Sequence, residues 1–147
     1  MAIRLMDMGD IPELAALYRE FRGEDADVDR MRGQYRRLCG DGAYVLLSAV
    51  EEGRLVGSVT GIVCQELYGD CRPFMVAENM IVKSGHRRRG IGTALLAGLE
   101  KAAQEKGCGQ IILVTDAGRL DARGFYEARG YGADTHKGYK KRLTPAE

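Results

Sequence analysis

The chain has 147 residues, of which 45% are hydrophobic and 29% are charged, and its formal net charge is +1. These values are typical of one globular domain, so we predict a single domain over residues 1–147. A nearly neutral chain has no overall field that would attract nucleic acid or a membrane surface. The charge is uneven, because residues 1–80 hold 9 Lys and Arg against 14 Asp and Glu, and residues 81–147 hold 13 against 7. Two interpretations stay open, namely chance with solvated helix faces, or an anion site in the second half that faces a cation site in the first.

The cysteines and histidines do not form a common metal or disulfide pattern. No two of the four cysteines are spaced as C-x-x-C, and the two histidines lie far apart in the sequence. We therefore predict no metal site. The N-terminus has no apolar signal region, and no apolar run approaches the roughly 20 residues of a membrane span. A reduced, cytoplasmic enzyme fits this pattern best.

In chain order, the first half predicts one strand, two helices and an antiparallel meander. Asp10 is placed to cap the first helix, with Pro12 near its first turn. Glu52-Gly53 is a typical hairpin turn between two strands. The expected elements are a strand over residues 2–6, a helix after Asp10, a helix over 28–38, and strands over 44–51, 55–64 and 74–83.

The second half changes to alternating helices and strands. Residues 90–106 predict a long amphipathic helix, and residues 110–115 predict an almost wholly apolar strand of the kind buried on both faces. A short helix over 121–129 stops at Gly130, and residues 131–143 are expected to supply one or two final strands. The element order predicts an α/β fold built on a mixed sheet.

The segment from residue 87 to residue 93 is the strongest functional signal. It is a basic, glycine-containing turn between a predicted strand and a predicted helix. The first turn of a helix has free backbone N–H groups and a positive dipole end, which suit a pyrophosphate. Gly90 and Gly92 would let phosphates approach the backbone, and Thr93 can add a hydroxyl donor. Arg87, Arg88 and Arg89 would attract a polyanion.

Two familiar phosphate motifs do not fit this turn. A Rossmann fingerprint would need glycine where Leu95 stands, and it would follow the strand directly. A P-loop would need lysine where Ile91 stands. A different kind of phosphate-binding turn and a basic surface turn without a ligand both remain.

Three stretches resemble the GNAT acetyltransferase superfamily. Residues 87–92 match its coenzyme A turn, R/Q-x-x-G-x-G/A, and residues 77–82 resemble its fourth strand. Residues 122–131 resemble its A-x-x-F-Y-E-x-x-G-[FY] signature. The resemblance implies a mixed, mostly antiparallel sheet flanked by helices, with a splay between strands 4 and 5. It also implies acetyl-CoA as cosubstrate and direct acetyl transfer to an amine in a ternary complex.

The resemblance also assigns the site residues. The pantetheine arm would lie along Met80, Ile81 and Val82, and a backbone N–H near Met80 would be the oxyanion donor. Tyr126 matches the family's general acid, and its alternative role is a core aromatic. Arg119 stands where many members carry an asparagine that holds the pantetheine, so we assign it no cofactor role. The expected cofactor-binding residues are Met80, Ile81, Val82, Arg87, Arg88, Arg89, Gly90, Ile91, Gly92 and Thr93.

Glu78 is the best candidate for the general base. It stands two residues before Met80, so strand alternation would place both side chains on one face, near the acyl group. Its alternatives are a surface carboxylate paired with an arginine, or a water chain that replaces a dedicated base. His86 precedes the phosphate turn and would lie on the wrong side of the thioester. His136 is a candidate for contact with the acceptor.

The acceptor is the least determined part. The loop over residues 23–29 is acidic and would suit a cationic amine, although a solvated loop that caps the second helix through Asp27 explains it as well. We expect N-acetylation of a small primary amine. A protein N-terminus or lysine, and a non-catalytic sensor of coenzyme A, are the alternatives. We expect no nucleic-acid or membrane partner, and a homodimer is an open alternative because dimers are common in the family.

Overall fold

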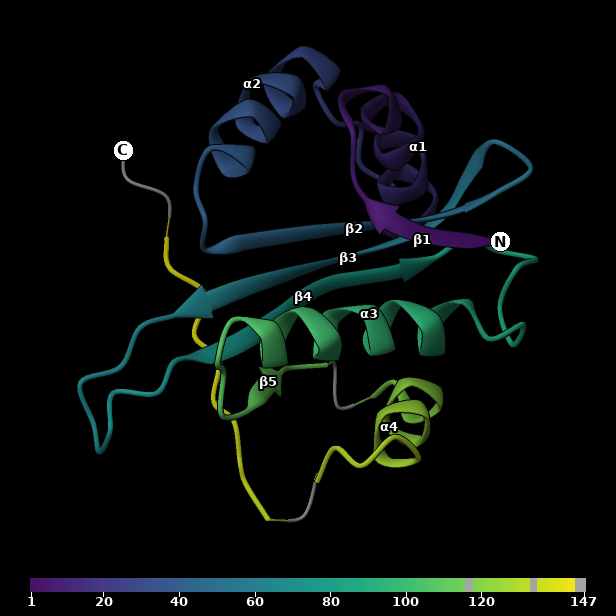
Figure 1. Ribbon diagram of the computed structural model, residues 1–147. Helices are drawn as coiled ribbons and strands as arrows, with labels where there is room; N and C mark the ends of the chain where they lie inside the picture. Colours follow the sequence, from purple (N-terminus) through teal and green to yellow (C-terminus); the bar gives the residue numbers. More distant parts are fainter. Residues whose placement is uncertain (116–117, 133–134, 145–147) are drawn as a thin grey trace. The chain divides into compact units, whose positions relative to one another are not determined.

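The computed structural model describes residues 1–115, 118–132 and 135–144 (Figure 1). The chain divides into two compact units, residues 1–113 and residues 114–147, and each is described by itself. The prediction of one domain over the whole chain stays a prediction.

The first unit is built on a five-stranded sheet in the order β1-β2-β3-β4-β5. The first three strand pairs are antiparallel, and β5 runs parallel to β4, so the predicted mixed sheet is confirmed. Glu52 and Gly53 connect β2 to β3 with positive φ angles of 50° and 75°, as a tight hairpin requires. The strands are β1 (Ala2–Leu5), β2 (Tyr44–Glu51), β3 (Arg54–Cys64), β4 (Phe74–Val82) and β5 (Ile111–Leu113).

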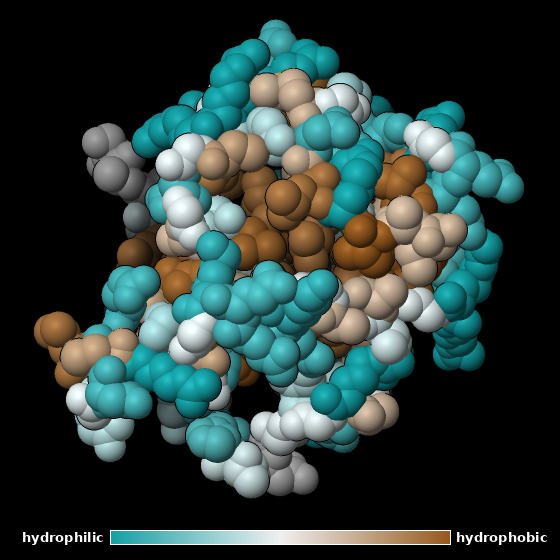
Figure 2. All heavy atoms as spheres, in the orientation of Figure 1, coloured by the Kyte–Doolittle hydropathy of each residue, from teal (hydrophilic) through white to brown (hydrophobic). Residues whose placement is uncertain are grey.

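Helices cover both faces of this sheet. Helix α3 (Ile91–Glu105) lies on one face, and α1 (Ile11–Arg22) and α2 (Val28–Cys39) lie on the other (Figure 1). Hydrophilic side chains cover the helices at the top of Figure 2, and hydrophobic atoms gather below them. The buried side chains form two hydrophobic clusters. One joins α3 to β2, β3 and β4, with Leu95 and Leu99 at its centre, and the other joins α1 to Leu55 and Ile81.

The start of α1 differs from the expectation. The Asp10 side chain makes no capping bond to this helix. It accepts two hydrogen bonds from Arg4, at 2.7 and 2.8 Å, and one from Ser48 at 2.8 Å. Asp7 caps the preceding 3₁₀ turn, η1 (Met8–Asp10), by accepting from the Gly9 N–H. The buried Asp10 carboxylate therefore links β1 and β2 to the start of α1 through hydrogen bonds.

The sheet opens between β4 and β5. The two strands pair over only three positions, from Met75–Ile111 to Ala77–Leu113, and β4 then continues to Val82. The edge of β4 beyond Ala77 is thus not covered by β5. This opening agrees with the predicted splay between strands 4 and 5.

The second unit contains α4 (Leu120–Glu127), close to the predicted helix. The expected final strands were wrong for the residues that the structure describes, because residues 131–132 and 135–144 belong to no strand. Three glycines and a Lys-Lys-Arg run between residues 130 and 142 leave no alternating apolar face to bury. No helix in the described part of the chain is long and apolar enough to cross a membrane.

Candidate active site

A turn of unusual backbone geometry connects β4 to α3. Gly85, Arg88 and Gly90 have positive φ angles of 83°, 61° and 82°. The turn starts with two backbone hydrogen bonds, from Lys83 N–H to the Val56 carbonyl and from His86 N–H to the Lys83 carbonyl. Gly90 is the N-cap of α3, and a Cβ built there meets no atom within 4 Å. The glycine is therefore needed for its left-handed conformation rather than for space within the chain.

This turn leaves a row of backbone donors without acceptors. Among the residues that the structure describes, no acceptor pairs with the backbone N–H groups of Arg88, Gly90, Ile91 or Gly92. The first turn of α3 has no side-chain cap and no acidic residue. Successive N–H groups next to left-handed residues form a concave anion site, and the helix dipole adds to it. The arrangement suits a phosphate or pyrophosphate.

The three arginines of the turn are not equivalent. Arg89 donates to Glu51 Oε1 at 2.9 Å, so its charge is partly neutralised. Arg87 makes a long hydrogen bond of 3.5 Å to the Val82 carbonyl. Arg88 has no ion pair with any described carboxylate. Arg87 and Arg88 are therefore the arginines best able to meet an anion.

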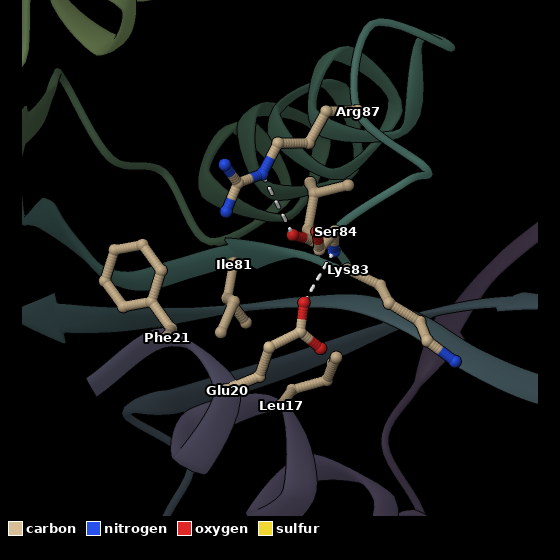
Figure 3. A pocket seen from close by; sticks show the side chains of 8 residues that line it. Leu17, Glu20, Phe21, Ile81, Lys83, Ser84 and Arg87 are labelled. Atoms are coloured by element: carbon tan, nitrogen blue, oxygen red, sulfur yellow. Dashed lines mark hydrogen bonds between the residues drawn. The ribbon is translucent and has the colours of Figure 1, made fainter. Parts of the chain in front are cut away.

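A cavity of about 230 Å³ lies beside the turn, between α1 and the end of β4 (Figure 3). Glu20 reaches in from α1, and its Oε1 accepts a hydrogen bond of 3.2 Å from the Ser84 N–H. Its lining residues are Leu17, Glu20, Phe21, Ile81, Val82, Lys83, Ser84 and Arg87. Sequence reasoning missed Glu20, because its position on α1 gives no motif that links it to a turn 64 residues later.

A bulge in β4 changes which face each candidate occupies. Asn79 has a φ of 53°, and the pairing with β3 shifts there, from Thr60–Glu78 to Ser58–Ile81. Ala77 and Met80 both pack on the α3 side, whereas Ile81 packs on the α1 side.

Glu78 therefore lies on the α1 side of the sheet, opposite Met80. The expectation that Glu78 and Met80 share a face was wrong, because the extra residue of the bulge reverses the alternation. Glu78 is exposed, and it remains the carboxylate of β4 that could accept a proton.

Tyr126 belongs to the second unit, in α4. Its ring makes edge contacts with Phe125 and Tyr131, with centroids 5.1 and 6.0 Å apart. Burial raises the pKa of Tyr126, and the charge of Arg119 opposes this shift. The phenol is protonated at neutral pH with or without this shift, as a proton donor requires. The aromatic contacts and the acid role are compatible, so both interpretations of Tyr126 stay open.

The remaining candidates have local partners. Asp27 caps α2 by accepting from the Arg30 N–H at 3.0 Å. Asp25 pairs with Arg19 at 3.1 Å. The acidic loop thus uses part of its charge within the chain, as the solvated-loop interpretation expects. His136 Nδ1 lies 2.8 Å from the Thr135 hydroxyl.

The expected absence of a metal site is untested by a structure of the protein alone. In the described segments, no group of three or more His, Cys, Asp and Glu side chains could hold a metal ion. All four cysteines are free, and Cys39 and Cys71 are exposed.

Structures with different acceptors in their names share this fold. Glucosamine-6-phosphate N-acetyltransferase from Arabidopsis thaliana superposes with a TM-score of 0.84 at 17% identity, covering 97% of each chain. Ribosomal-protein-alanine N-acetyltransferase from Brucella melitensis biovar Abortus 2308 superposes with a TM-score of 0.78 at 26% identity, covering 97% of this chain and 100% of that one. The fold alone therefore does not decide the acceptor.

The chain also resembles known proteins in sequence. YxbD of Bacillus subtilis (strain 168), an uncharacterized protein, is 32% identical over 84 residues, which are 57% of this chain and 47% of YxbD. The chain spans about half the length of the curated relatives it matches. The profile of the acetyltransferase (GNAT) family matches residues 10–131, which include the turn, β4 and the Tyr126 signature. With most of its length inside that match and its sheet built as in the family's known structures, the chain belongs to the acetyltransferase (GNAT) family.

Proposed function

We propose that the chain transfers an acetyl group from acetyl-CoA to a primary amine of a small molecule, by direct transfer in a ternary complex. The observation that carries the proposal is the row of backbone N–H groups at Arg88, Gly90, Ile91 and Gly92, at the start of α3, which have no acceptor among the described residues. Pyrophosphate is the part of coenzyme A that such a row binds.

The residues around the turn fit the rest of coenzyme A. Arg87 and Arg88 are available to the phosphates, and Thr93 stands in the first helical turn. Beyond Ala77, the edge of β4 has no pairing with β5. Backbone groups at Met80, Ile81 and Val82 would then pair with the amides of the pantetheine arm, as an added strand would.

Bound acetyl-CoA would supply a thioester carbonyl, which is open to attack by a neutral amine. A backbone N–H near Met80 would stabilise the developing oxyanion. Glu78, directly or through a water, would take the proton that the amine nitrogen loses as it bonds to the carbonyl carbon. Tyr126 would donate its proton to the sulfur as the carbon–sulfur bond breaks.

The class of acceptor rests on the acidic side chains near α1. Glu20 lines the cavity, and Glu78 lies on the same side of the sheet. Carboxylates there would favour a cationic amine. The 26% identity to a ribosomal-protein-alanine N-acetyltransferase favours a second candidate, acetylation of a protein N-terminus.

We further propose that the enzyme works in the cytoplasm without a nucleic-acid or membrane partner. Four free thiols, two of them exposed, would persist best in a reducing compartment. A homodimer is compatible with the proposal, and size-exclusion chromatography coupled to light scattering would test it.

Calorimetric titration with acetyl-CoA, against NAD and ATP as controls, tests the cosubstrate. Selective binding of acetyl-CoA supports the proposal, and an equal response to ATP would reduce the turn to a general polyanion site. Release of free thiol with a panel of small amines and N-terminal peptides then identifies the acceptor. A non-catalytic sensor would bind acetyl-CoA and release no thiol with any of them.

A further inference from the structure

Glu51, the last residue of β2, contacts the turn from a distant part of the chain. Its Oε1 accepts a hydrogen bond of 2.9 Å from Arg89, and its Oε2 lies 3.5 Å from Nε2 of His86. Only 25% of the Glu51 side chain and 27% of the His86 side chain are exposed. A partly buried charge contact is screened less by water than an exposed ion pair.

The two contacts lie on either side of a strained residue. Arg88 has a φ of 61°, a left-handed conformation that is strained for a non-glycine residue. Such a conformation persists only where the surroundings hold it. His86 and Arg89 flank Arg88 in the chain, so one carboxylate holds both sides of the left-handed residue.

The side chain of His86 makes few polar contacts with the described residues. His86 Nδ1 is buried and has no hydrogen-bond partner among the described residues. Glu51 is therefore the polar group that this ring contacts in the part of the chain that the structure describes, with Oε2 at 3.5 Å from Nε2. Arg89 donates to the same carboxylate, so its guanidinium is less available to bind a phosphate.

We propose that Glu51 is a positioning residue for coenzyme A binding. By contacting His86 and Arg89, it keeps the backbone of Arg88 in the left-handed conformation. The backbone N–H groups at the start of α3 then point toward the phosphates. The inference rests on the proposed function, since it assigns a task to the same turn. It also divides the arginines, because Arg89 orients the turn while Arg87 and Arg88 remain for the anion.

The test compares Glu51→Ala with Glu52→Ala, which removes an exposed carboxylate from the next position. Affinity for acetyl-CoA is measured by calorimetry, and KM and kcat are measured with acetyl-CoA and with acetyl-pantetheine, which lacks the phosphates. We expect Glu51→Ala to weaken acetyl-CoA binding about fivefold to tenfold, at unchanged kcat. Acetyl-pantetheine kinetics should not change, and Glu52→Ala should stay within about twofold of wild type.

A second variant separates positioning from charge repulsion. Glu51→Gln keeps the size and one acceptor oxygen, so it should show a smaller loss in the same direction. Tighter acetyl-CoA binding in either Glu51 variant would mean that the carboxylate opposes the phosphates, and it would overturn the inference. Equal losses for acetyl-CoA and acetyl-pantetheine would also overturn it, because they would indicate general damage.

The experiment distinguishes this inference from the proposed function. Wild-type protein that binds no acetyl-CoA would reject the function, whereas normal binding by Glu51→Ala would reject only the role of Glu51. Amide hydrogen exchange at His86 and Ala94, whose N–H groups donate to the Lys83 and Gly90 carbonyls at the two ends of the turn, measures the order of the turn without any ligand. It should be faster in Glu51→Ala than in Glu52→Ala, and equal rates would reject the positioning role.

Discussion

Helices α2 and α3 begin in opposite ways. At α2, Asp27 accepts from the Arg30 N–H, and Asp29 adds an acidic residue to the first turn. At α3, the N-cap is Gly90, with no side-chain cap and no acid in the first turn. At α2, one of the first N–H groups pairs with a carboxylate of the chain. At α3, the first N–H groups lie next to arginines and have no acceptor in the part of the chain that the structure describes.

The two helix starts are expected to contribute differently to the stability of the chain and to ligand binding. A capped helix start stabilises the chain, whereas an uncapped one exposes donors that cost stability unless a ligand or water pairs with them. The acidic loop over residues 23–29 and the basic turn over residues 87–92 therefore differ in how their polar groups are paired. The acidic loop uses part of its charge within the chain, whereas the proposed function assigns the N–H groups of the basic turn to a bound ligand.

Removing the left-handed glycine at the start of α3 should have the largest effect. In Gly90→Val, a β-branched residue cannot adopt a φ of 82° without strain, so the turn must change shape. We expect acetyl-CoA affinity to fall about 100-fold, close to 3 kcal/mol, by calorimetry. Gly107→Val is the control, because Gly107 has a φ of 76° beyond the other end of α3. Normal affinity in Gly90→Val would break the comparison between the two helix starts.

Binding and chemistry should separate at Tyr126. In Tyr126→Phe the ring and its contacts with Phe125 and Tyr131 remain, and the proton donor is lost. We expect kcat to fall about 100-fold, with acetyl-CoA affinity within about twofold of wild type. Tyr139→Phe, at an exposed tyrosine, should leave both unchanged. Full turnover of Tyr126→Phe with several amines would remove this residue from the mechanism.

Asp10 should make stability depend on acid pH. Burial opposes ionisation of this carboxyl, but hydrogen bonds from Arg4, the Asp7 N–H and Ser48 outweigh it and lower its pKa. The resulting stability is present above the unfolded pKa, near 3.9, and is lost as pH falls through the lower folded pKa.

Asp10→Asn should therefore cost about 2 kcal/mol of unfolding free energy at pH 7 and less at pH 3, by urea titration. Asp70→Asn removes an exposed carboxylate and is the control. A deficit that is the same at both pH values would mean that the ionised carboxylate is not what stabilises this corner.

The cap of α2 should give the smallest effect. Asp27→Ala removes the acceptor for the Arg30 N–H and should cost about 1 kcal/mol of stability. Acetyl-CoA affinity should stay unchanged, which is the reverse of Gly90→Val. Glu24→Ala, in the same loop, should change neither quantity. A loss of acetyl-CoA affinity in Asp27→Ala would mean that the acidic loop takes part in cofactor binding.

Local patterns predicted the regular elements and the turn. The spacing of Ile91, Leu95 and Leu99 fixed the inner face of α3, and these residues are buried in the core. The turn at residues 87–92 was predicted from glycines and arginines alone. Both predictions depend on short-range periodicity and backbone conformation, which a sequence displays directly.

The predictions that were wrong concerned strand pairing and the face of the sheet on which a side chain lies. Strands were expected over residues 131–143, but the described residues there form none, since a strand also needs an apolar face and a partner. The face of Glu78 was wrong because one extra residue, at the Asn79 bulge, reverses strand alternation. Residue type alone does not predict such a bulge from a single sequence.

By itself, the sequence determined the order of elements, the mixed sheet and the family, because the periodicity and the two signatures are local. Only the tertiary structure decided that Glu20 and Glu51 reach the turn from α1 and β2, and that Arg89 is paired. Those contacts join residues 38 and 64 positions apart in the chain. They exist because the sheet and its helices bring distant side chains together, and no local pattern encodes them.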